Sequence, residues 1–324
     1  MHIYCDDGST TVKLAWFDNG EIKKFRSSNS FRKGWKIEGM GSRKTYNYSI
    51  DGLKFTFDDV SNEAISTTHI EYQYGDTNLL AVHHALLNCG IEPQPIKLTV
   101  TLPISEFYTE DCQKNEVNIQ RKIDNLTREI ALNKGKCFTI TSVDVMPESL
   151  PAVFSSLVKE NVGSLETSLV IDLGGTTLDA GVIVGQFDDV TAIHGNPNIG
   201  VSLVTQATLS ALRMADSDTS AFIADTVIKR RDDREFLSQI VNDGSQIDNV
   251  VAAINNAINR LGDRVVNELS DFRNVNRVWL VGGGAELIEP YVRNGWKLPS
   301  SRIVLVNEPQ TALVQEMALF KQEE

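Results

Sequence analysis

An acidic, glycine-containing turn occurs twice in the chain, as Asp6-Asp7-Gly8-Ser9-Thr10 and as Asp172-Leu173-Gly174-Gly175-Thr176-Thr177. Backbone N–H groups in such a turn form a concave anion site, and neighbouring hydroxyl groups add further donors. For one copy alone, a hairpin turn with a capping aspartate is the better interpretation. Two copies in matching context favour a polyphosphate bound from both sides. The predicted phosphate-binding residues are Gly8, Ser9, Thr10, Gly174, Gly175, Thr176 and Thr177.

Charged residues accompany both turns. Lys13 lies two strand positions beyond Thr11, so it shares that residue's face and can reach a phosphate. A phosphate would repel a nearby carboxylate, so Asp6 and Asp172 are explained best by Mg²⁺ between carboxylate and phosphate. Because Mg²⁺ keeps several of its waters, we expect both carboxylates to contact the ion through water.

A third glycine cluster, Gly282-Gly283-Gly284, follows the apolar run 278–281. A turn without side chains lets a flat ring lie against the backbone, so these glycines are candidates for contact with the base of a nucleotide. Other nucleotide and metal motifs are absent from the sequence: there is no Gly-x-x-x-x-Gly-Lys-Ser/Thr loop, no complete dinucleotide fingerprint, no His-Glu-x-x-His and no paired Cys-x-x-Cys. The pattern predicts a nucleotide in a cleft between two related lobes.

The elements around both acidic turns have the same order. A short apolar run precedes each turn, at 3–5 and at 169–171, and an alternating run follows each, at 12–16 and at 178–182. Each half is therefore predicted to contain a strand, a tight turn and a second strand.

The remaining pattern alternates strands with helices. Asp51-Gly52 predicts a hairpin over 46–57, because this dipeptide adopts the positive φ angles of a type I′ turn. Helices are predicted from a cap at Asp76 or Thr77 to a stop at Gly90, and over 119–130, 202–211, 250–269 and 311–320. Strands are predicted over 96–102 and 138–146. Such alternation indicates an α/β fold.

The bulk properties narrow the functional classes. The 324 residues carry a net charge of -12, which argues against extensive direct contact with nucleic acid or anionic membrane. No apolar stretch is long enough for a bilayer span, and the N-terminus lacks the features of a signal peptide. The scattered cysteines have no metal-ligand spacing. We therefore expect a cytoplasmic protein with reduced thiols. The adjacent His83 and His84 cannot both face one metal from a helix, so we expect them to be structural.

These residues also carry a family resemblance. The two turns with Lys13, the connector 101–103 and the run 281–284 resemble the five-part pattern shared by actins, sugar kinases and heat-shock chaperone ATPases. The segments 81–87, 145–149, 200–205 and 283–288 are more specifically similar to the ParM (StbA) family of actin-like plasmid-partition ATPases.

The resemblance implies an actin-like ATPase fold, with two related ribonuclease-H-like lobes around a nucleotide cleft. It places 1–161 and about 309–324 in the first lobe, with a small β-rich insertion at about 20–60. It places 162–308 in the second lobe, with a helical insertion at about 203–275.

The resemblance also implies a Mg²⁺-dependent ATPase that polymerises with bound nucleotide; GTP remains an alternative to ATP. Glu148 matches the family's catalytic glutamate, which positions the attacking water, and Asp172 would help to hold that water and the hydrated ion. From the residues alone, Glu148 after Pro147 would be an acidic residue at a helix N-terminus. Both roles are compatible.

The implied partners are further copies of the chain, in a helical filament, and a DNA-bound adaptor of the ParR type that links filament ends to a centromere-like site on a plasmid. No direct contact with DNA or membrane is expected. A small-molecule, sugar-type kinase of the same superfamily is the alternative, although the sequence has no obvious sugar-pocket signature. A chaperone-like ATPase is disfavoured, because no substrate-binding domain follows the second lobe.

Overall fold

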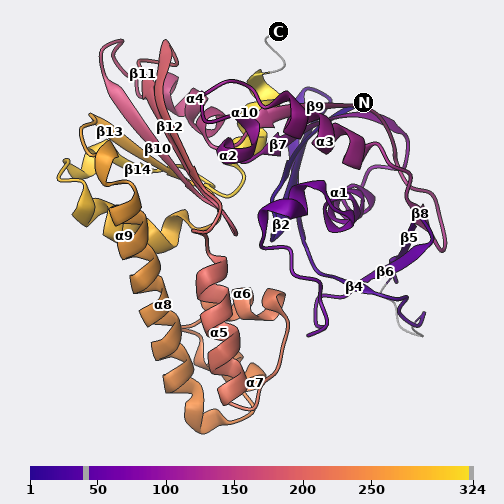
Figure 1. Cartoon of the computed structure of the whole chain (residues 1–324). Helices are drawn as coiled ribbons and strands as arrows, with labels where there is room; N and C mark the ends of the chain where they lie inside the picture. The colour runs from indigo at the N-terminus through magenta and orange to yellow at the C-terminus, as the bar shows by residue number, and fades with distance from the viewer. Residues whose placement is uncertain (39–43, 321–324) are drawn as a thin grey trace.

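Each half of the chain forms a five-stranded sheet, and the two sheets have the same topology (Figure 1). The structure, a computed structural model, describes residues 1–38 and 44–320. The first sheet has the order β3-β2-β1-β7-β9, with β1 (His2–Asp7), β2 (Thr11–Asp18), β3 (Glu21–Ser28), β7 (Pro95–Leu102) and β9 (Thr139–Pro147). The second has the order β12-β11-β10-β13-β14, with β10 (Thr167–Leu173), β11 (Leu178–Val184), β12 (Asp189–Asn196), β13 (Arg277–Val281) and β14 (Ile303–Leu305).

The strand directions match as well. In each sheet the first three strands of the half form an antiparallel meander, and the last two add in parallel on the other side. The predicted α/β fold with two related lobes is confirmed. Because the first strand of each sheet leads directly into an acidic turn, the repeated topology places both turns at equivalent positions.

The strands of the segment 20–60 belong to two different sheets. Asn19 and Gly20 have φ angles of 51° and 82°, which suit a tight hairpin turn, and they fold β3 directly back onto β2. The segment therefore divides: β3 extends the first main sheet, and the following strands form a separate small sheet. That sheet has the order β4-β6-β5-β8, with β4 (Phe31–Lys33), β5 (Asn47–Ile50), β6 (Leu53–Phe57) and β8 (Ala131–Leu132). The predicted Asp51-Gly52 hairpin joins β5 and β6.

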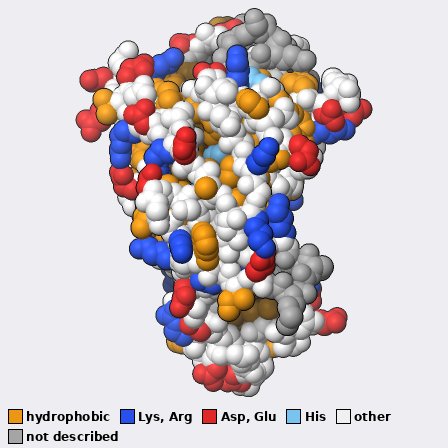
Figure 2. Space-filling view, turned by 90° about the vertical axis from the view of Figure 1, so that its right-hand side faces the viewer, with side chains coloured by type: hydrophobic (Ala, Val, Ile, Leu, Met, Phe, Trp, Pro, Cys, Tyr) orange, Lys and Arg blue, Asp and Glu red, His pale blue; other side chains and the backbone are white. Residues whose placement is uncertain are grey.

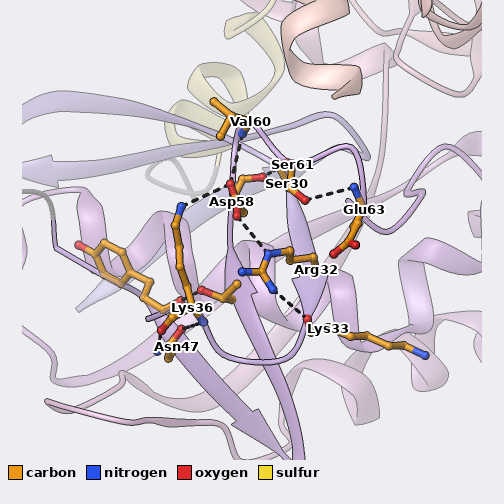
Figure 3. Close-up of polar contacts among 11 residues, drawn as sticks. Ser30, Arg32, Lys33, Lys36, Asn47, Asp58, Val60, Ser61 and Glu63 are labelled. Atoms are coloured by element: carbon orange, nitrogen blue, oxygen red, sulfur yellow. Dashed lines mark hydrogen bonds and ion pairs between the residues drawn. The ribbon is translucent and has the colours of Figure 1, made fainter. Parts of the chain in front are cut away.

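A buried carboxylate organises one end of the small sheet (Figure 3). Asp58 forms ion pairs with Arg32 at 3.1 Å and with Lys36 at 3.4 Å, and its carbonyl accepts a hydrogen bond from the Ser30 hydroxyl at 2.7 Å. The adjoining turn reaches the second half of the chain. Its Asp59 carbonyl accepts a hydrogen bond from Ser220 at 2.8 Å, so the small sheet and the helical part of the second lobe are in contact.

The Asp58 cluster gives a stability prediction. Burial on its own raises the pKa of Asp58, but the ion pairs with Arg32 and Lys36 outweigh it and leave the pKa below its ordinary value. Asp58→Asn should lower the free energy of unfolding at neutral pH by about 1–3 kcal/mol. A lowered pKa contributes stability above the unfolded pKa, so the difference should shrink as pH falls below about 4. Urea titrations at two pH values measure it.

The matched control for this prediction is Asp111→Asn, because Asp111 is exposed and makes no ion pair among the residues that the structure describes. Equal effects of the two substitutions, or an Asp58→Asn effect that does not depend on pH, would show that the cluster contributes no charge-dependent stability.

Helices α1 (Asp76–Asn88) and α3 (Glu116–Leu126) pack on the first sheet. The same half of the chain contains α2 (Ile104–Phe107), α4 (Phe154–Lys159) and the 3-10 turns η1 (Ile70–Tyr74) and η2 (Leu150–Val153). The predicted cap of α1 is wrong: Gly75 is the N-cap, and the carboxylate of Asp76 bonds Arg128 at 2.8 Å instead. Gly90 follows the helix with a φ of 88°, as its predicted stop requires. His83 and His84 are buried in α1, and His84 bonds the Tyr48 hydroxyl at 2.8 Å.

The second lobe has a helical extension below its sheet in Figure 1. It contains α5 (Ser202–Met214), α6 (Ala221–Lys229), α7 (Arg234–Ile240), η3 (Gly244–Gln246) and α8 (Ile247–Glu268), and η4 (Ser270–Phe272) follows α8. Helix α9 (Ala285–Gly295) and η5 (Ser300–Arg302) come next in the chain. The predicted apolar stripe of α8 is buried at Val250, Ile254, Ala257, Leu261 and Val265. In the described part of the chain, no helix combines the length and apolarity that a membrane span needs.

A separate apolar core joins the two main sheets. It contains Tyr4 and Ala15 from the first sheet, Val170 and Trp279 from the second, and Met317 from the last helix, α10 (Ala312–Phe320). The C-terminal helix thus packs between both halves. Residues 321–324, which the predicted first lobe includes, lie outside the described residues. The predicted lobe boundaries remain a prediction.

Candidate functional site

The two acidic turns face each other across a narrow gap. The Ser9 hydroxyl on the first turn and the Thr176 hydroxyl on the second lie 2.6 Å apart. Gly175 comes so close to the first turn that a Cβ on it would lie 2.6 Å from Thr10 Cγ2. The turns therefore converge, and glycine is required at Gly175 by this close approach. Its φ angle is not in the left-handed region.

A neighbouring glycine supports the second turn. A Cβ on Gly200 would lie 2.5 Å from the carbonyl oxygen of Gly175, which is a backbone atom that cannot rotate away. The segment that follows is tied to the same turn, because Ser202 N–H donates to the Gly175 carbonyl at 2.8 Å. Gly200 thus fixes the distance between the start of α5 and the second acidic turn.

We expect Gly200→Ala to weaken nucleotide binding by about tenfold or more, and to cost about 1–3 kcal/mol of stability through overpacking. Isothermal titration with nucleotide and thermal unfolding measure the two effects. Gly244→Ala is the matched control, since a Cβ there would meet nothing within 4 Å. Wild-type nucleotide affinity in folded Gly200→Ala would show that the position of this turn does not control binding.

One cavity brings most of the predicted site residues together. Its lining includes Asp6, Gly8, Ser9, Thr10, Lys13, Glu148, Asp172, Gly174, Gly175, Thr176, Thr177, Gly282 and Gly283. Gly284 is not among the lining residues. A Cβ on it would lie 2.6 Å from Val201 Cγ2 and 2.7 Å from Leu173 Cδ2, so its position is set by packing behind the cavity.

The charged residues of the two hairpins occupy equivalent positions. Asp6 pairs across β1 and β2 with Lys13, and Asp172 pairs across β10 and β11 with Asp179. Directly paired residues lie on the same face of a sheet, so each pair points toward the same side. The ammonium of Lys13 bonds the carboxylate of Asp6 at 2.9 Å. The first hairpin therefore contributes a carboxylate with a cation, and the second contributes two carboxylates.

This arrangement concentrates negative charge. Burial, together with the neighbouring carboxylate of Asp6, raises the pKa of Asp172 to about 7. Burial and Asp172 likewise raise the pKa of Asp179 to about 7. Burial and the charges of Asp179, Asp6 and Asp172 raise the pKa of Glu148 well above its ordinary value. Burial alone would lower the pKa of Lys13, but Asp6 outweighs it and the pKa is raised. A cation placed in the cavity would stabilise all the carboxylates in their charged forms.

Glu148 is held at the end of β9 by an unusual turn. Its N–H donates to the Leu102 carbonyl at 2.8 Å, and one carboxylate oxygen accepts a hydrogen bond from the Thr101 hydroxyl at 3.3 Å. Ser149 then adopts φ 75° and ψ -73°, and Leu150 N–H donates to the Glu148 carbonyl at 3.0 Å, which closes a three-residue turn. Strain of this kind is found at functional sites. Glu148 was expected at a helix N-terminus, and it lies directly before Ser149, the N-cap of the 3-10 turn η2 that begins at Leu150.

The carboxylates of Asp6 and Asp172 suit a hydrated Mg²⁺ ion better than an ion that is bound by protein side chains alone. Among residues 1–38 and 44–320, no group of three or more His, Cys, Asp or Glu side chains could hold a metal ion. Mg²⁺ is commonly bound by one or two carboxylates together with phosphate oxygens and waters. Asp6 and Asp172 beside the two acidic turns fit that donor set, and they would hold the ion if a nucleotide bound there.

The third glycine cluster borders the same cavity. Gly282 has a φ of 88°, and a Cβ on it would lie 2.1 Å from Asp172 Oδ1, so both its conformation and its surroundings require glycine. Its N–H donates to the Pro309 carbonyl at 3.0 Å. Gly283 faces the side chain of Gln310, whose amide nitrogen is 3.6 Å from the position of a Cβ on Gly283. The contact of a flat ring with this backbone remains a prediction.

Sequence reasoning missed several residues near the cavity. Asp179 is buried, and its carboxylate accepts a hydrogen bond from Ile104 N–H at 3.0 Å. Its signal was present in the sequence: Asp179 follows Asp172 at the same seven-residue spacing by which Lys13 follows Asp6. Among the lining residues, those that were missed are His69, Ile70, Tyr72, Gln73, Pro309, Gln310 and Leu313. Most of these lie on segments outside the repeated hairpins and carry no motif.

Comparisons with known proteins identify a family for the chain. The N-terminal profile of a family described as plasmid segregation protein ParM matches residues 1–159, and its C-terminal profile matches residues 162–320. A search of curated proteins found no match.

Three solved structures illustrate the similarity of fold. A 15-stranded ParM filament from Clostridium botulinum has a TM-score of 0.75 and 14% identity, covering 100% of this chain and 99% of that one. The archaeal actin homolog Ta0583 in complex with ADP has a TM-score of 0.68 and 15% identity, covering 100% of both chains. The actin-like protein Alp7A has a TM-score of 0.65 and 12% identity, covering 99% and 96%. At these identities the likeness establishes the fold alone.

Proposed function

The chain belongs to the ParM family of plasmid segregation proteins, and from this premise we propose that it is a Mg²⁺-dependent ATPase whose nucleotide cycle controls assembly into filaments. It is an actin-like plasmid segregation protein that forms filaments, and the kinase alternative is not favoured. The single observation that carries the enzymatic part is the contact between the two phosphate turns, where Ser9 and Thr176 lie 2.6 Å apart.

The proposed chemistry is hydrolysis of the terminal phosphate. A water oxygen attacks the terminal phosphorus, the bond from phosphorus to the bridging oxygen breaks, and ADP and inorganic phosphate are the products. Phosphoryl transfer needs mainly alignment and charge neutralisation. Glu148 would accept a hydrogen bond from the attacking water, and the two turns with Lys13 would bind the phosphates. A bound Mg²⁺ would supply further positive charge beside Asp6 and Asp172.

The glycine cluster commits few side chains to the base of the nucleotide. We propose ATP as the nucleotide, in keeping with the family resemblance, and GTP is the alternative that the experiment below includes. The ADP complex of the archaeal actin homolog supports a nucleotide in this fold.

We further propose that a DNA-bound adaptor of the ParR type links filament ends to plasmid DNA. The net charge of -12 supports delegation of DNA contact to a basic partner. Acidic and basic side chains are interspersed on the face shown in Figure 2, so the basic residues visible there do not form one continuous area.

The proposal is tested by light scattering and phosphate release on the purified chain. With Mg-ATP, we expect scattering to rise only above a threshold protein concentration, with phosphate release after assembly. Mg-GTP measures the alternative nucleotide, and EDTA should abolish both signals. If the chain stays monomeric at high protein concentration with both Mg-ATP and Mg-GTP, nucleotide-dependent filament assembly is refuted.

A further inference from the structure

A fully buried lysine lies behind the first phosphate turn. The side chain of Lys122, on α3, is completely buried, and its ammonium bonds the equally buried carboxylate of Asp7. Asp7 also accepts a hydrogen bond from Asn78 Nδ2 at 2.6 Å. An internal ion pair gains little net stability over an apolar replacement, because both charges lose their hydration. The pair is therefore better explained by what it positions.

The same ammonium fixes the side-chain amide of Gln73. Lys122 Nζ donates to Gln73 Oε1 at 2.5 Å. Because an ammonium can only donate, the amide oxygen must face Lys122, and the amide NH₂ must face away from it. Gln73 is itself nearly buried and lines the nucleotide cavity. Within the described residues its amide nitrogen makes no hydrogen bond, so it is a donor left available to a ligand.

Hydrogen bonds through Thr101 also connect Asp7 to Glu148. The second carboxylate oxygen of Asp7 accepts a hydrogen bond from Thr101 N–H at 3.3 Å, and the Thr101 hydroxyl donates to Glu148 at 3.3 Å. Successive strand residues point to opposite faces, so Asp6 faces the cavity while Asp7 faces α3 behind it. One buried network thus holds Gln73 and Glu148, which are the donor and the carboxylate of the same cavity.

We propose that the Gln73 amide donates a hydrogen bond to an oxygen of the terminal phosphoryl group, and that Lys122 and Asp7 are positioning residues that hold it there. This inference rests on the proposed ATPase function. The amide donor stabilises negative charge on the phosphoryl oxygens as the bond to the bridging oxygen breaks. Neither Lys122 nor Asp7 touches the nucleotide.

The direct test is steady-state hydrolysis of Mg-ATP by Gln73→Leu, which keeps the size of the side chain and removes the donor. A lost hydrogen bond to a charged group predicts a kcat lower by about tenfold or more, with KM changed by less than about threefold. Gln94→Leu is the control, because Gln94 is an exposed glutamine outside the cavity. A kcat equal to that of the wild type in folded Gln73→Leu overturns the proposal.

A second set of variants separates positioning from packing. Lys122→Met alone leaves a buried charge and can fail to fold, so the informative variant is Asp7→Asn/Lys122→Met, which removes both charges. It should fold and lose kcat to about the same extent as Gln73→Leu, and adding Gln73→Leu to it should cost no further activity. Lys122→Arg keeps a donor at this position, so its kcat should be reduced less than that of Asp7→Asn/Lys122→Met.

If the effects of Gln73→Leu and of Asp7→Asn/Lys122→Met on kcat are fully additive, the positioning role of Lys122 is refuted. If the wild-type chain releases no phosphate, the proposed ATPase function fails and this inference fails with it. If the wild type is active and Gln73→Leu is equally active, only this inference is wrong.

Discussion

Glu148→Ala is expected to hydrolyse ATP about 100-fold or more slowly than the wild type, while it still binds nucleotide and still assembles. The side chain lines the cavity, and its carboxylate accepts a hydrogen bond from the Thr101 hydroxyl at 3.3 Å, so its removal should leave both acidic turns in place. Phosphate release at saturating Mg-ATP measures the loss. Light scattering measures assembly in the same sample, and filaments should persist longer because the nucleotide in them is not consumed.

Two controls make this result specific. Glu148→Gln keeps the size of the side chain and removes the charge, so it should be nearly as slow if the carboxylate itself accepts a hydrogen bond from the attacking water. Glu110→Ala changes an exposed glutamate on a turn and should have no effect. Wild-type hydrolysis by Glu148→Ala would show that another group positions the water.

Asp172→Asn is expected to have the second large effect, with opposite signs for activity and stability. Hydrolysis should fall by about 100-fold, because the carboxylate that would hold the hydrated ion is lost. Without nucleotide, the variant should be more stable than the wild type above pH 7. Substitution removes a buried charge that burial and Asp6 disfavour.

The pH dependence follows from the same residue. The pKa of Asp172 in the folded chain is about 7, above its ordinary value, so between about pH 4 and pH 7 the folded state binds a proton that the unfolded state has lost. The wild type without ligands should therefore lose stability as pH rises through this window, and Asp172→Asn should lose less. Chemical denaturation at intervals of pH measures both curves.

Two outcomes would contradict the prediction for Asp172→Asn. Unchanged magnesium dependence of hydrolysis in Asp172→Asn would remove Asp172 from the vicinity of the ion. Parallel stability curves for the two proteins would show that its carboxyl group titrates normally. Asp189→Asn, at the exposed start of β12, is the control for a general effect of lost negative charge.

The sequence predicted the part of the site that local chemistry determines. A strand, a glycine turn and a second strand form one hairpin, so Gly8 and Gly174 could be assigned to phosphate turns from neighbouring residues alone. Duplication then predicted that the hairpins occupy equivalent positions in two lobes. The bond between Lys13 and Asp6 was not predicted, although the pairing of β1 with β2 places them directly opposite each other.

The parts that were missed depend on contacts between distant segments. Gln73 reaches the cavity because η1 packs beside α3, where Lys122 lies 49 residues further along the chain. Neither residue carries a motif. Gly75 as the cap of α1 was missed for a similar reason, since the side chain of Asp76 is used by Arg128 from a distant loop. The division of segment 20–60 could have been predicted, because Asn19-Gly20 is as strong a hairpin signal as Asp51-Gly52.

The central claim is that both turns bind one triphosphate, and a structure of the chain with Mg²⁺ and a non-hydrolysable ATP analogue tests it most directly. We expect the outer phosphates to accept hydrogen bonds from backbone N–H groups of both turns, at Gly8 to Thr10 and at Gly174 to Thr177, with the terminal phosphorus facing Glu148. Phosphates bound by one turn only, or at a different surface, would contradict the account.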